Sequence, residues 1–536
     1  MRQKSTCLSV PGVLALLFLC LHLVGLIVYA AKATNDINRV VPDNEYTKMW
    51  LNVVGFVLVC QSLFVISREF STKRVLHAPL LWIAYGIFML ISTIMLFASY
   101  MALGERGTAV WFLTWFGGGL LVLIYSMKAR RGYLVDSIMN IPHHRLVVED
   151  SAANDAASAF LDTVFVTVTI LFVFIWTFFL ALQGVWFAAD RGNFSAPGEL
   201  VDVSVKASTY KLHVYCQGTY RDDSPTYVLS NEEGTPMTAL IALQRSLVNR
   251  NRRVCLYDRP GYGWSEPGYR VQAPVQVVQS LKQALDKMGE KGPFIMAGYG
   301  AGGEYAQLYT HIFPTAVAGM VLIDSYPNRE YLKAYALNQT TTNEYNDHTE
   351  STSHYFQSMR VVSPMGWQRP RVTDFPGFEP TELLSAHISL YSTNSHWQAR
   401  YFEYDGCGCR PYQALQGYRD QNTTSFLRDH NWPLTWPALP KPLAASSPDD
   451  PGLPLLVITA NQSLHADCRS NDSDLDEQEC NALMAEQSIL QRQTDLYLST
   501  LSNNHQHEVC PDRCDHNLVY TSADWVSLKM VDWYGE

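Results

Sequence analysis

The sequence predicts a membrane helical bundle of five transmembrane helices, followed by an α/β domain. Three observations support this prediction. Five long apolar stretches lie within the first 190 residues, and short apolar strands alternate with helix-like segments after Gly192. The net charge changes from about +2 over residues 1–190 to about −12 over residues 191–536. The acidic second part argues against nucleic-acid binding, because phosphates require a basic surface.

Each apolar stretch is close to the ~20 residues that cross ~30 Å of hydrocarbon as a helix. A soluble core of this size cannot bury five such stretches joined by short loops, so we expect all five to span a membrane. Arg2 and Lys4 give the first stretch some likeness to a signal peptide, but its length favours a retained helix. The predicted spans are Pro11–Ala31, Met49–Ile66, Pro79–Tyr100, Ala109–Met127 and Phe160–Leu182.

The short loops predict the orientation. Lys and Arg are concentrated before the first span and in the second and fourth loops, which places the N-terminus in the cytoplasm and residues 190–536 on the lumenal or extracellular side. Eight of the 11 cysteines follow the last span, which suits an oxidising compartment. The sequence does not distinguish between the plasma membrane and internal membranes. The glycosylation acceptors also all follow that span, at Asn193, Asn338, Asn422, Asn461 and Asn471.

Few polar residues interrupt the predicted spans. A transporter would place ionisable groups near the middle of the bilayer, and the sequence shows no such set. The bundle is therefore expected to act as an anchor in the lipid bilayer or as a packing surface for other membrane-protein subunits.

Beyond Gly192 the residue pattern predicts a mostly parallel sheet with helices on both faces. Leu200–Lys206 and Leu212–Tyr215 alternate like the arms of a hairpin. Ala273–Met288 has helical spacing, with Pro274 in its first turn. A second helix-like run is Glu304–His311, and a last helix is expected near Trp525–Val531. The remaining expected strands are Thr226–Leu229, Val254–Tyr257, Phe294–Ala297, Val317–Ile323 and Leu453–Thr459.

Three motifs in this region occur in a recognisable order: the segment Tyr257–Ser265 (YDRPGYGWS), the strand–turn–helix around Gly300, and the strand end Val321–Ser325 (VLIDS). In order and spacing they resemble the α/β-hydrolase superfamily, over about residues 198–330 and 450–535. The resemblance implies an α/β-hydrolase-like core in two parts, residues 191–330 and 451–536, after the transmembrane region 1–190. It also implies that residues 331–450 form a cap insertion, whose many aromatic residues suit either a lid over a small apolar ligand or a glycosylated surface.

The nucleophile of such a hydrolase lies in a G-x-S-x-G turn between a strand and a helix. Here the same frame reads Gly298-Tyr299-Gly300-Ala301-Gly302, so Gly300 stands at the nucleophile position. Glycine tolerates the strained backbone of this turn but offers no hydroxyl. In addition, the loop that normally supplies an oxyanion donor contains Glu232 and Glu233, whose carboxylates would repel an oxyanion unless they face solvent. Acyl-enzyme chemistry is therefore not expected at this turn.

Other catalytic positions are retained. The resemblance places the catalytic histidine at His516, and Asp324 and Asp467 are the candidate acids. A His–Asp pair can activate water as a general base. The alternatives are that His516 is a surface loop residue and that Asp324 orients the next turn. Ser265 is a conceivable substitute nucleophile, although the resemblance makes it structural.

Cysteines allow two interpretations. Cys407, Cys409, Cys510 and Cys514 together with His516 could suggest a metal site, but their spacing is not a zinc pattern, and disulfides are favoured. We expect no metal and no cofactor. Cys468 and Cys480 could close a local loop in an acidic segment. Cys216 and Cys255 lie on strands that the fold would make adjacent, where a disulfide and two buried thiols would look the same in sequence.

Two functions from different classes follow. The first is a membrane-anchored pseudo-hydrolase that serves binding, or assembly as a subunit of a membrane complex. The second is a membrane-bound hydrolase of ester or lipid-like substrates that uses His516 with an acid. Its nucleophile would be either a residue outside the G-x-S-x-G turn (a non-elbow nucleophile) or activated water.

Overall fold

The computed structural model divides the chain into two compact units. The first comprises Met1–Asp36, Val41–Asn193 and Val361–Trp367, and the second comprises the rest of the chain. Isolated residues between 20 and 97 and residues 369, 378 and 380 are also described. The continuous described ranges are 152–205, 208–268, 273–325, 354–366, 381–403, 452–460, 498–499, 501–511 and 514–534.

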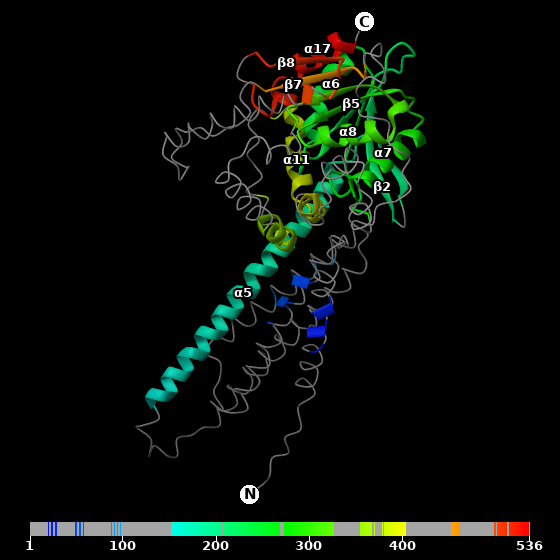
Figure 1. Ribbon diagram of the computed structural model, residues 1–536. Coiled ribbons are helices and arrows are strands. Elements are labelled where there is room, and N and C mark those ends of the chain that lie inside the picture. Colours follow the sequence, from blue (N-terminus) through cyan, green and yellow to red (C-terminus); the bar gives the residue numbers. More distant parts are fainter. Residues whose placement is uncertain are drawn as a thin grey trace, which may run out of the picture. The chain divides into compact units, whose positions relative to one another are not determined.

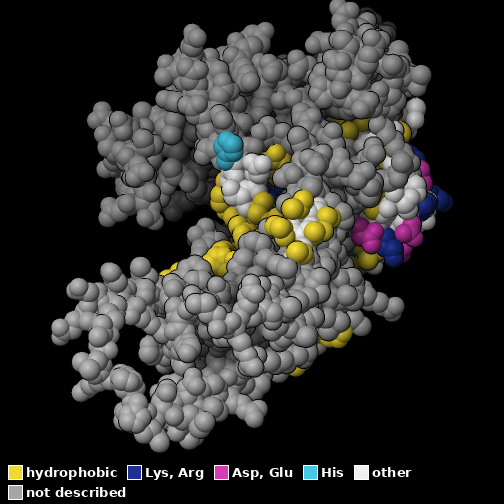
Figure 2. Space-filling model, turned by 90° about the horizontal axis from the view of Figure 1, so that it is seen from below, with side chains coloured by type: hydrophobic (Ala, Val, Ile, Leu, Met, Phe, Trp, Pro, Cys, Tyr) yellow, Lys and Arg dark blue, Asp and Glu magenta, His cyan; other side chains and the backbone are white. Residues whose placement is uncertain are grey.

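In the first unit, the long helix α5 (Ala152–Asn193) packs against the short 3-10 helix η3 (Ser363–Met365). One side of α5 is buried at Thr177 and Leu180. Elsewhere α5 exposes apolar side chains such as Val168. Among the side chains that are coloured in Figure 2, hydrophobic ones gather near the centre of the face.

The expectation of five transmembrane helices is overturned. Within the described parts of the chain, no helix is both long enough and apolar enough to cross a membrane. Most residues of the first four predicted spans lie outside the described residues, and the fifth, Phe160–Leu182, is part of α5. An apolar run does not by itself distinguish burial in lipid from packing against protein. In α5, for example, Trp176 stacks on Trp50 with ring centroids 5.1 Å apart.

The second unit contains an eight-stranded sheet in the order β1-β2-β4-β3-β5-β6-β7-β8. Strand β2 runs antiparallel to β1 and β4, and the other neighbouring strands are parallel. The alternating burial of β1 explains the predicted hairpin, because every second side chain faces the core. The strands are β1 (Glu199–Val205), β2 (Ser208–Gln217), β3 (Tyr227–Ser230), β4 (Val254–Tyr257), β5 (Phe294–Tyr299), β6 (Val317–Ile323), β7 (Leu455–Thr459) and β8 (His505–Val509).

Helices cover both faces of this sheet (Figure 1). Helices α7 (Pro274–Lys287) and α8 (Gly302–Ile312) bury apolar side chains with Val228 and Met296 on one face. Helix α6 (Ile241–Asn249), α16 (Leu518–Thr521) and α17 (Ala523–Tyr534) cover the other face. The remaining elements are η1 (Met237–Leu240), η2 (Pro314–Ala316), η5 (Thr381–Leu383), α11 (Leu384–Tyr391) and α12 (Asn394–Tyr401).

This arrangement confirms the α/β-hydrolase-like fold. The segment after β4 shows why the fold needs its motif residues. The Asp258 carboxylate bonds to the His213 ring at 2.8 Å and accepts the backbone N–H groups of Met237 and Trp264. A Cβ on Gly263 would lie 2.2 Å from this carboxylate, so only glycine fits there. The buried carboxylate of Asp258 thus joins β2, the turn after β4 and the chain before α6. These bonds fix the carboxyl end of β4 relative to its neighbours.

Candidate functional site

The turn from β5 into α8 has the shape of a nucleophile elbow without a nucleophile. Gly300 has a φ of 53°, in the left-handed region that favours glycine. Its N–H donates to the carbonyl of Ile323 at 3.0 Å. The turn approaches β3 so closely that a Cβ on Gly302 would lie 2.2 Å from the carbonyl oxygen of Ser230. The backbone of the elbow is therefore present, and its reactive position carries no side chain.

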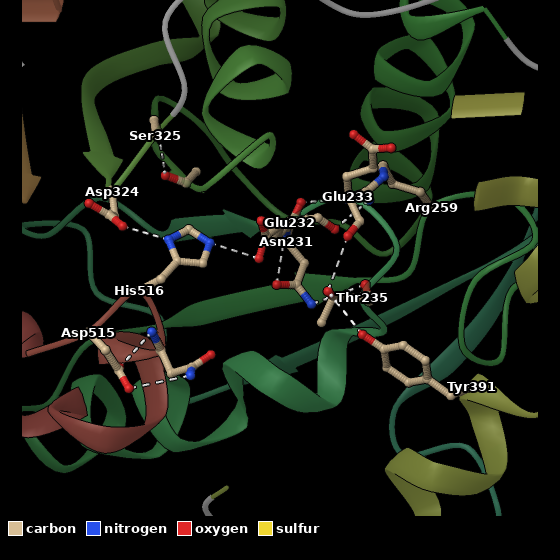
Figure 3. Close-up of polar contacts among 12 residues, drawn as sticks. Asn231, Glu232, Glu233, Thr235, Arg259, Asp324, Ser325, Tyr391, Asp515 and His516 are labelled. Atoms are coloured by element: carbon tan, nitrogen blue, oxygen red, sulfur yellow. Dashed lines mark hydrogen bonds and ion pairs between the residues drawn. The ribbon is translucent and has the colours of Figure 1, made fainter. Parts of the chain in front are cut away.

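His516 and Asp324 meet beside this turn (Figure 3). Nδ1 of His516 lies 2.5 Å from Oδ2 of Asp324, and Oδ1 of Asp324 accepts the N–H of Ala460 at 3.2 Å. Asp324 follows β6 and has a φ of 42°, a strained conformation for a residue with a Cβ. The structure thus places Gly300, His516 and Asp324 close together around this turn. Asp467, the other candidate acid, lies outside the described residues.

Glu232 occupies the place next to the missing nucleophile. Its Oε2 atom lies 3.0 Å from Nε2 of His516, on the opposite side of the ring from Asp324. A Cβ built on Gly300 would be 3.0 Å from Cγ and Cδ of Glu232 and 3.1 Å from its Oε1. From the sequence, Glu232 was expected only to repel an oxyanion. Its contact with His516 joins residues that no spacing in the sequence relates.

The two carboxylates change the charge of the imidazole. Burial by itself lowers the pKa of His516, but the charge of Glu232 and the hydrogen bonds to Asp324 and Glu232 outweigh it and raise the pKa to about 10. Tyr299 lies against the imidazole, with ring centroids 4.8 Å apart. At neutral pH the ring is therefore an imidazolium, which has no free nitrogen with which to accept a proton.

The loop after β3 is closed on itself. The backbone N–H of Glu232 donates to Oδ1 of Asn231 at 2.9 Å, and Nδ2 of Asn231 donates to the carbonyl of Thr235 at 3.1 Å. A loop of this kind normally presents one of its N–H groups to the oxyanion. Here the N–H of Glu232 is used within the loop.

Two further residues of the site were missed by sequence analysis. Arg259 donates to the backbone carbonyls of Asn231 and Glu232, at 2.5 and 2.7 Å. It is also paired with Glu403, from the segment that follows α12. An arginine in the YDRPGYGWS motif was visible in the sequence, but its distant partner was not.

Ser265 has a structural position. Its buried hydroxyl accepts the N–H of His213 at 2.8 Å and donates to the carbonyl of Asp258 at 2.7 Å. One lone pair and the proton of this hydroxyl are thus engaged in the hydrogen-bond network of the turn after β4. This placement agrees with the structural role that the resemblance implied.

Two disulfides are present among the described cysteines. Cys216 and Cys255 are register partners on β2 and β4 and are bonded to each other, as are Cys510 and Cys514. Glu290 lies near the first pair, but both sulfurs are oxidised and Glu290 pairs with Arg253, so this group is not arranged for a metal. The remaining candidates Cys407, Cys409, Cys468 and Cys480 lie outside the described residues.

One predicted glycosylation acceptor can be located. Asn193, the last residue of α5, is exposed, as is the hydroxyl-bearing Ser195 of its motif. The acceptors Asn338, Asn422, Asn461 and Asn471 lie outside the described residues.

Comparison with known proteins gives partial matches. No family model matches the chain. An uncharacterized vacuolar membrane protein of Saccharomyces cerevisiae is 32% identical over 143 residues, which are 24% of this chain and 22% of that protein. An uncharacterized protein of Schizosaccharomyces pombe is 27% identical over 163 residues, which are 26% of this chain and 30% of that protein. The chain thus spans less than a third of the length of these relatives.

Solved structures with some similarity include hydrolases. A thermophilic esterase from Thermogutta terrifontis has 13% identity and a TM-score of 0.40, and it covers 63% of this chain and 98% of its own. A hydrolase from Pseudomonas aeruginosa has 14% identity and a TM-score of 0.39, with 63% and 99% coverage.

Proposed function

We propose that this protein is a membrane-associated α/β-hydrolase-like protein that has lost serine-hydrolase chemistry and serves binding or assembly. The observation that carries the proposal is the position of Glu232. Its carboxylate lies beside Gly300 and pairs with His516 at 3.0 Å, where a serine hydroxyl would otherwise contact the histidine. The site therefore lacks the nucleophile and keeps its base protonated.

The expected loss of rate is large. Removal of a nucleophile of this kind typically lowers turnover by ~10⁶-fold, and what remains, ~10³–10⁴ over water, comes from binding and oxyanion stabilisation. In this protein one N–H of the oxyanion loop is bonded to Asn231. The residual activity is therefore expected to fall below that range.

Membrane association and a lumenal or extracellular position belong to the same proposal. The yeast relative is described as a vacuolar membrane protein. Disulfides such as Cys216–Cys255 persist in oxidising compartments and are rare in the cytosol. The exposed acceptor Asn193 suits the same side of a membrane.

A fluorophosphonate serine-hydrolase probe tests the loss of chemistry. We expect no labelling of the native protein and weak labelling of Gly300→Ser, because Glu232 competes with the new hydroxyl for His516. The double variant Gly300→Ser/Glu232→Ala is expected to label, and His516→Ala added to it abolishes labelling. Labelling of the native protein would show a working nucleophile and refute the proposal.

A second candidate is a hydrolase with a non-elbow nucleophile. It is favoured by the same contact, because Oε2 of Glu232 is a carboxylate oxygen within 3.0 Å of an imidazolium that can donate a proton. Activation of water by His516 is less well supported, because it requires a neutral ring. Turnover of p-nitrophenyl esters that is lost in both Glu232→Gln and His516→Ala, and retained in Ser265→Ala, would favour this candidate.

The binding role needs its own measurement. We expect affinity purification of the full chain from its native membrane to recover a stable membrane-protein partner, and the same purified complex to show no ester turnover. A chain that purifies alone and turns over esters would exclude this role. An apolar ligand under the predicted cap is a further outcome, and mass spectrometry of an organic extract of the purified protein would detect it.

A further inference from the structure

Arg259 lies between the loop that carries Glu232 and the side chain of Glu403, which follows α12. Its guanidinium is buried, with 3% of the side chain exposed. Two of its N–H groups donate to the carbonyls of Asn231 and Glu232 at 2.5 and 2.7 Å. Bonds to charged donors are stronger than neutral ones, so Arg259 fixes the main chain on both sides of the Glu232 N–H.

Glu403 supplies the counter-charge for Arg259. Its Oε1 accepts from Nε of Arg259 at 2.8 Å and from the hydroxyl of Tyr305 at 2.8 Å. Its Oε2 accepts from Nη2 of Arg259 at 3.1 Å and from the hydroxyl of Tyr262 at 2.7 Å. Both carboxylate oxygens are thus fully used by residues of the core, although Glu403 itself belongs to the segment predicted as the cap.

The position of Arg259 depends on this pair. The guanidinium stacks on the rings of Tyr262 and Tyr305, 5.0 and 5.1 Å from their centroids. Without Glu403 a buried cation would keep its two carbonyls but lose its counter-ion, which is strongly unfavourable. Arg259 would then move toward water and release the carbonyls of the loop.

The predicted cap contacts the same loop at two further places. The hydroxyl of Tyr391 in α11 donates to Oγ1 of Thr235 at 3.3 Å. Arg400 in α12 lies so close to Gly234 that a Cβ there would be 2.5 Å from its Nε. The loop that carries Glu232 is therefore contacted by α11 and α12, and it is bonded to Arg259, the partner of Glu403.

We propose that the predicted cap controls the blocked site: Glu403, acting through the positioning residue Arg259, holds the Glu232 carboxylate against His516. This inference rests on the proposed function, and it identifies how the block is maintained. When Glu403 leaves Arg259, the loop relaxes, Glu232 separates from His516 and the imidazole becomes neutral.

Diethylpyrocarbonate modification of His516 in the full-length protein tests this coupling, because the reagent acylates neutral imidazole. Peptide mass spectrometry measures the rate for His516 at pH 7.5. In the native protein we expect slow modification, since a group with a pKa of about 10 is neutral in only roughly one molecule in 300 at that pH. Glu232→Gln and Glu403→Gln are each expected to raise the rate more than tenfold.

The matched control is Glu382→Gln. Glu382 pairs with Arg245 at 2.6 Å, in another contact between the predicted cap and the core, but both side chains are about half exposed. This variant should leave the His516 rate unchanged. A folded Glu403→Gln protein whose His516 is as protected as in the native protein would overturn the inference.

A second variant covers a failure of Glu403→Gln to fold. Tyr262→Phe/Tyr305→Phe removes two hydrogen bonds from Glu403 and keeps its charge pair with Arg259. We expect an intermediate rate, and an unchanged rate would also count against the coupling. Failure of the proposed function is seen separately: in that case Glu232→Gln does not raise the rate, or the native protein reacts with the fluorophosphonate.

Discussion

The carboxylate of Glu232 lies 3.0 Å from Nε2 of His516, while Asp324 holds Nδ1 of the same ring at 2.5 Å. In an active serine hydrolase the Nε2 position faces the nucleophile. Here an acidic side chain from the oxyanion loop takes that position, and the histidine is held between two negative charges. The same residues that would support catalysis therefore form a closed ionic group.

Glu232→Gln is expected to change the pH dependence of stability. The folded-state pKa of His516, about 10, exceeds its ordinary value of 6.5, so its stabilising effect is complete below pH 6.5 and is lost as pH rises to 10. The native protein should lose on the order of 1 kcal/mol for each pH unit as pH rises from 7 toward the folded-state pKa. Glu232→Gln should show a flatter profile. Urea unfolding followed by tryptophan fluorescence measures both, and parallel profiles would argue against the ion pair.

Glu403→Ala is expected to destabilise the second unit by roughly 3–5 kcal/mol, because it leaves the buried Arg259 cation without a partner. Glu382→Ala removes an exposed ion pair and should cost less than about 1 kcal/mol. Urea unfolding midpoints compare the two variants. Equal effects would mean that Arg259 finds water or another acceptor.

Ser265→Ala is expected to lower stability by roughly 1–3 kcal/mol, since it leaves the buried N–H of His213 without its acceptor. The control Ser204→Ala removes a hydroxyl from an exposed hydrogen bond with Thr209 and should change stability by less than about 0.5 kcal/mol. Neither variant should alter probe labelling of Gly300→Ser/Glu232→Ala. Loss of labelling in Ser265→Ala would give that serine a chemical role.

Removal of the Cys216–Cys255 disulfide by a double alanine substitution is expected to cost roughly 2–4 kcal/mol, because it frees a loop of 39 residues in the unfolded chain. Cys20→Ala, at an exposed free thiol, is the control and should have little effect. Thermal unfolding under non-reducing conditions gives the comparison. An unchanged midpoint would mean that strand pairing alone fixes β2 against β4.

The sequence predicted most strands of the second unit because their side chains alternate or form short apolar runs. It did not predict β8 (His505–Val509), whose residues His505, Gln506, His507 and Glu508 are polar. This edge strand is specified by its pairing with β7, a tertiary interaction that propensity does not report. Helix α6 was also not predicted.

The sequence also identified some residues of the candidate site, but it could not identify their contacts, and the reason is physical. Gly300, His516 and Asp324 were identified because the order and spacing of the motifs indicate their positions. The contact of Glu232 with His516 depends on the side-chain direction in a loop, and that of Arg259 with Glu403 joins residues 144 positions apart. Neither local pattern nor spacing contains this information. The apolar stretches gave a wrong prediction of transmembrane helices for a related reason. Hydrophobicity alone does not determine whether lipid or protein covers a helix.

The 3.0 Å approach of a Gly300 Cβ to Glu232 has an evolutionary consequence. A single Gly300→Ser substitution would meet the Glu232 side chain and a histidine that is already protonated, so it would give almost no activity for selection to act upon. Serine chemistry at this turn is therefore expected to need at least two changes, one of which moves or removes the glutamate.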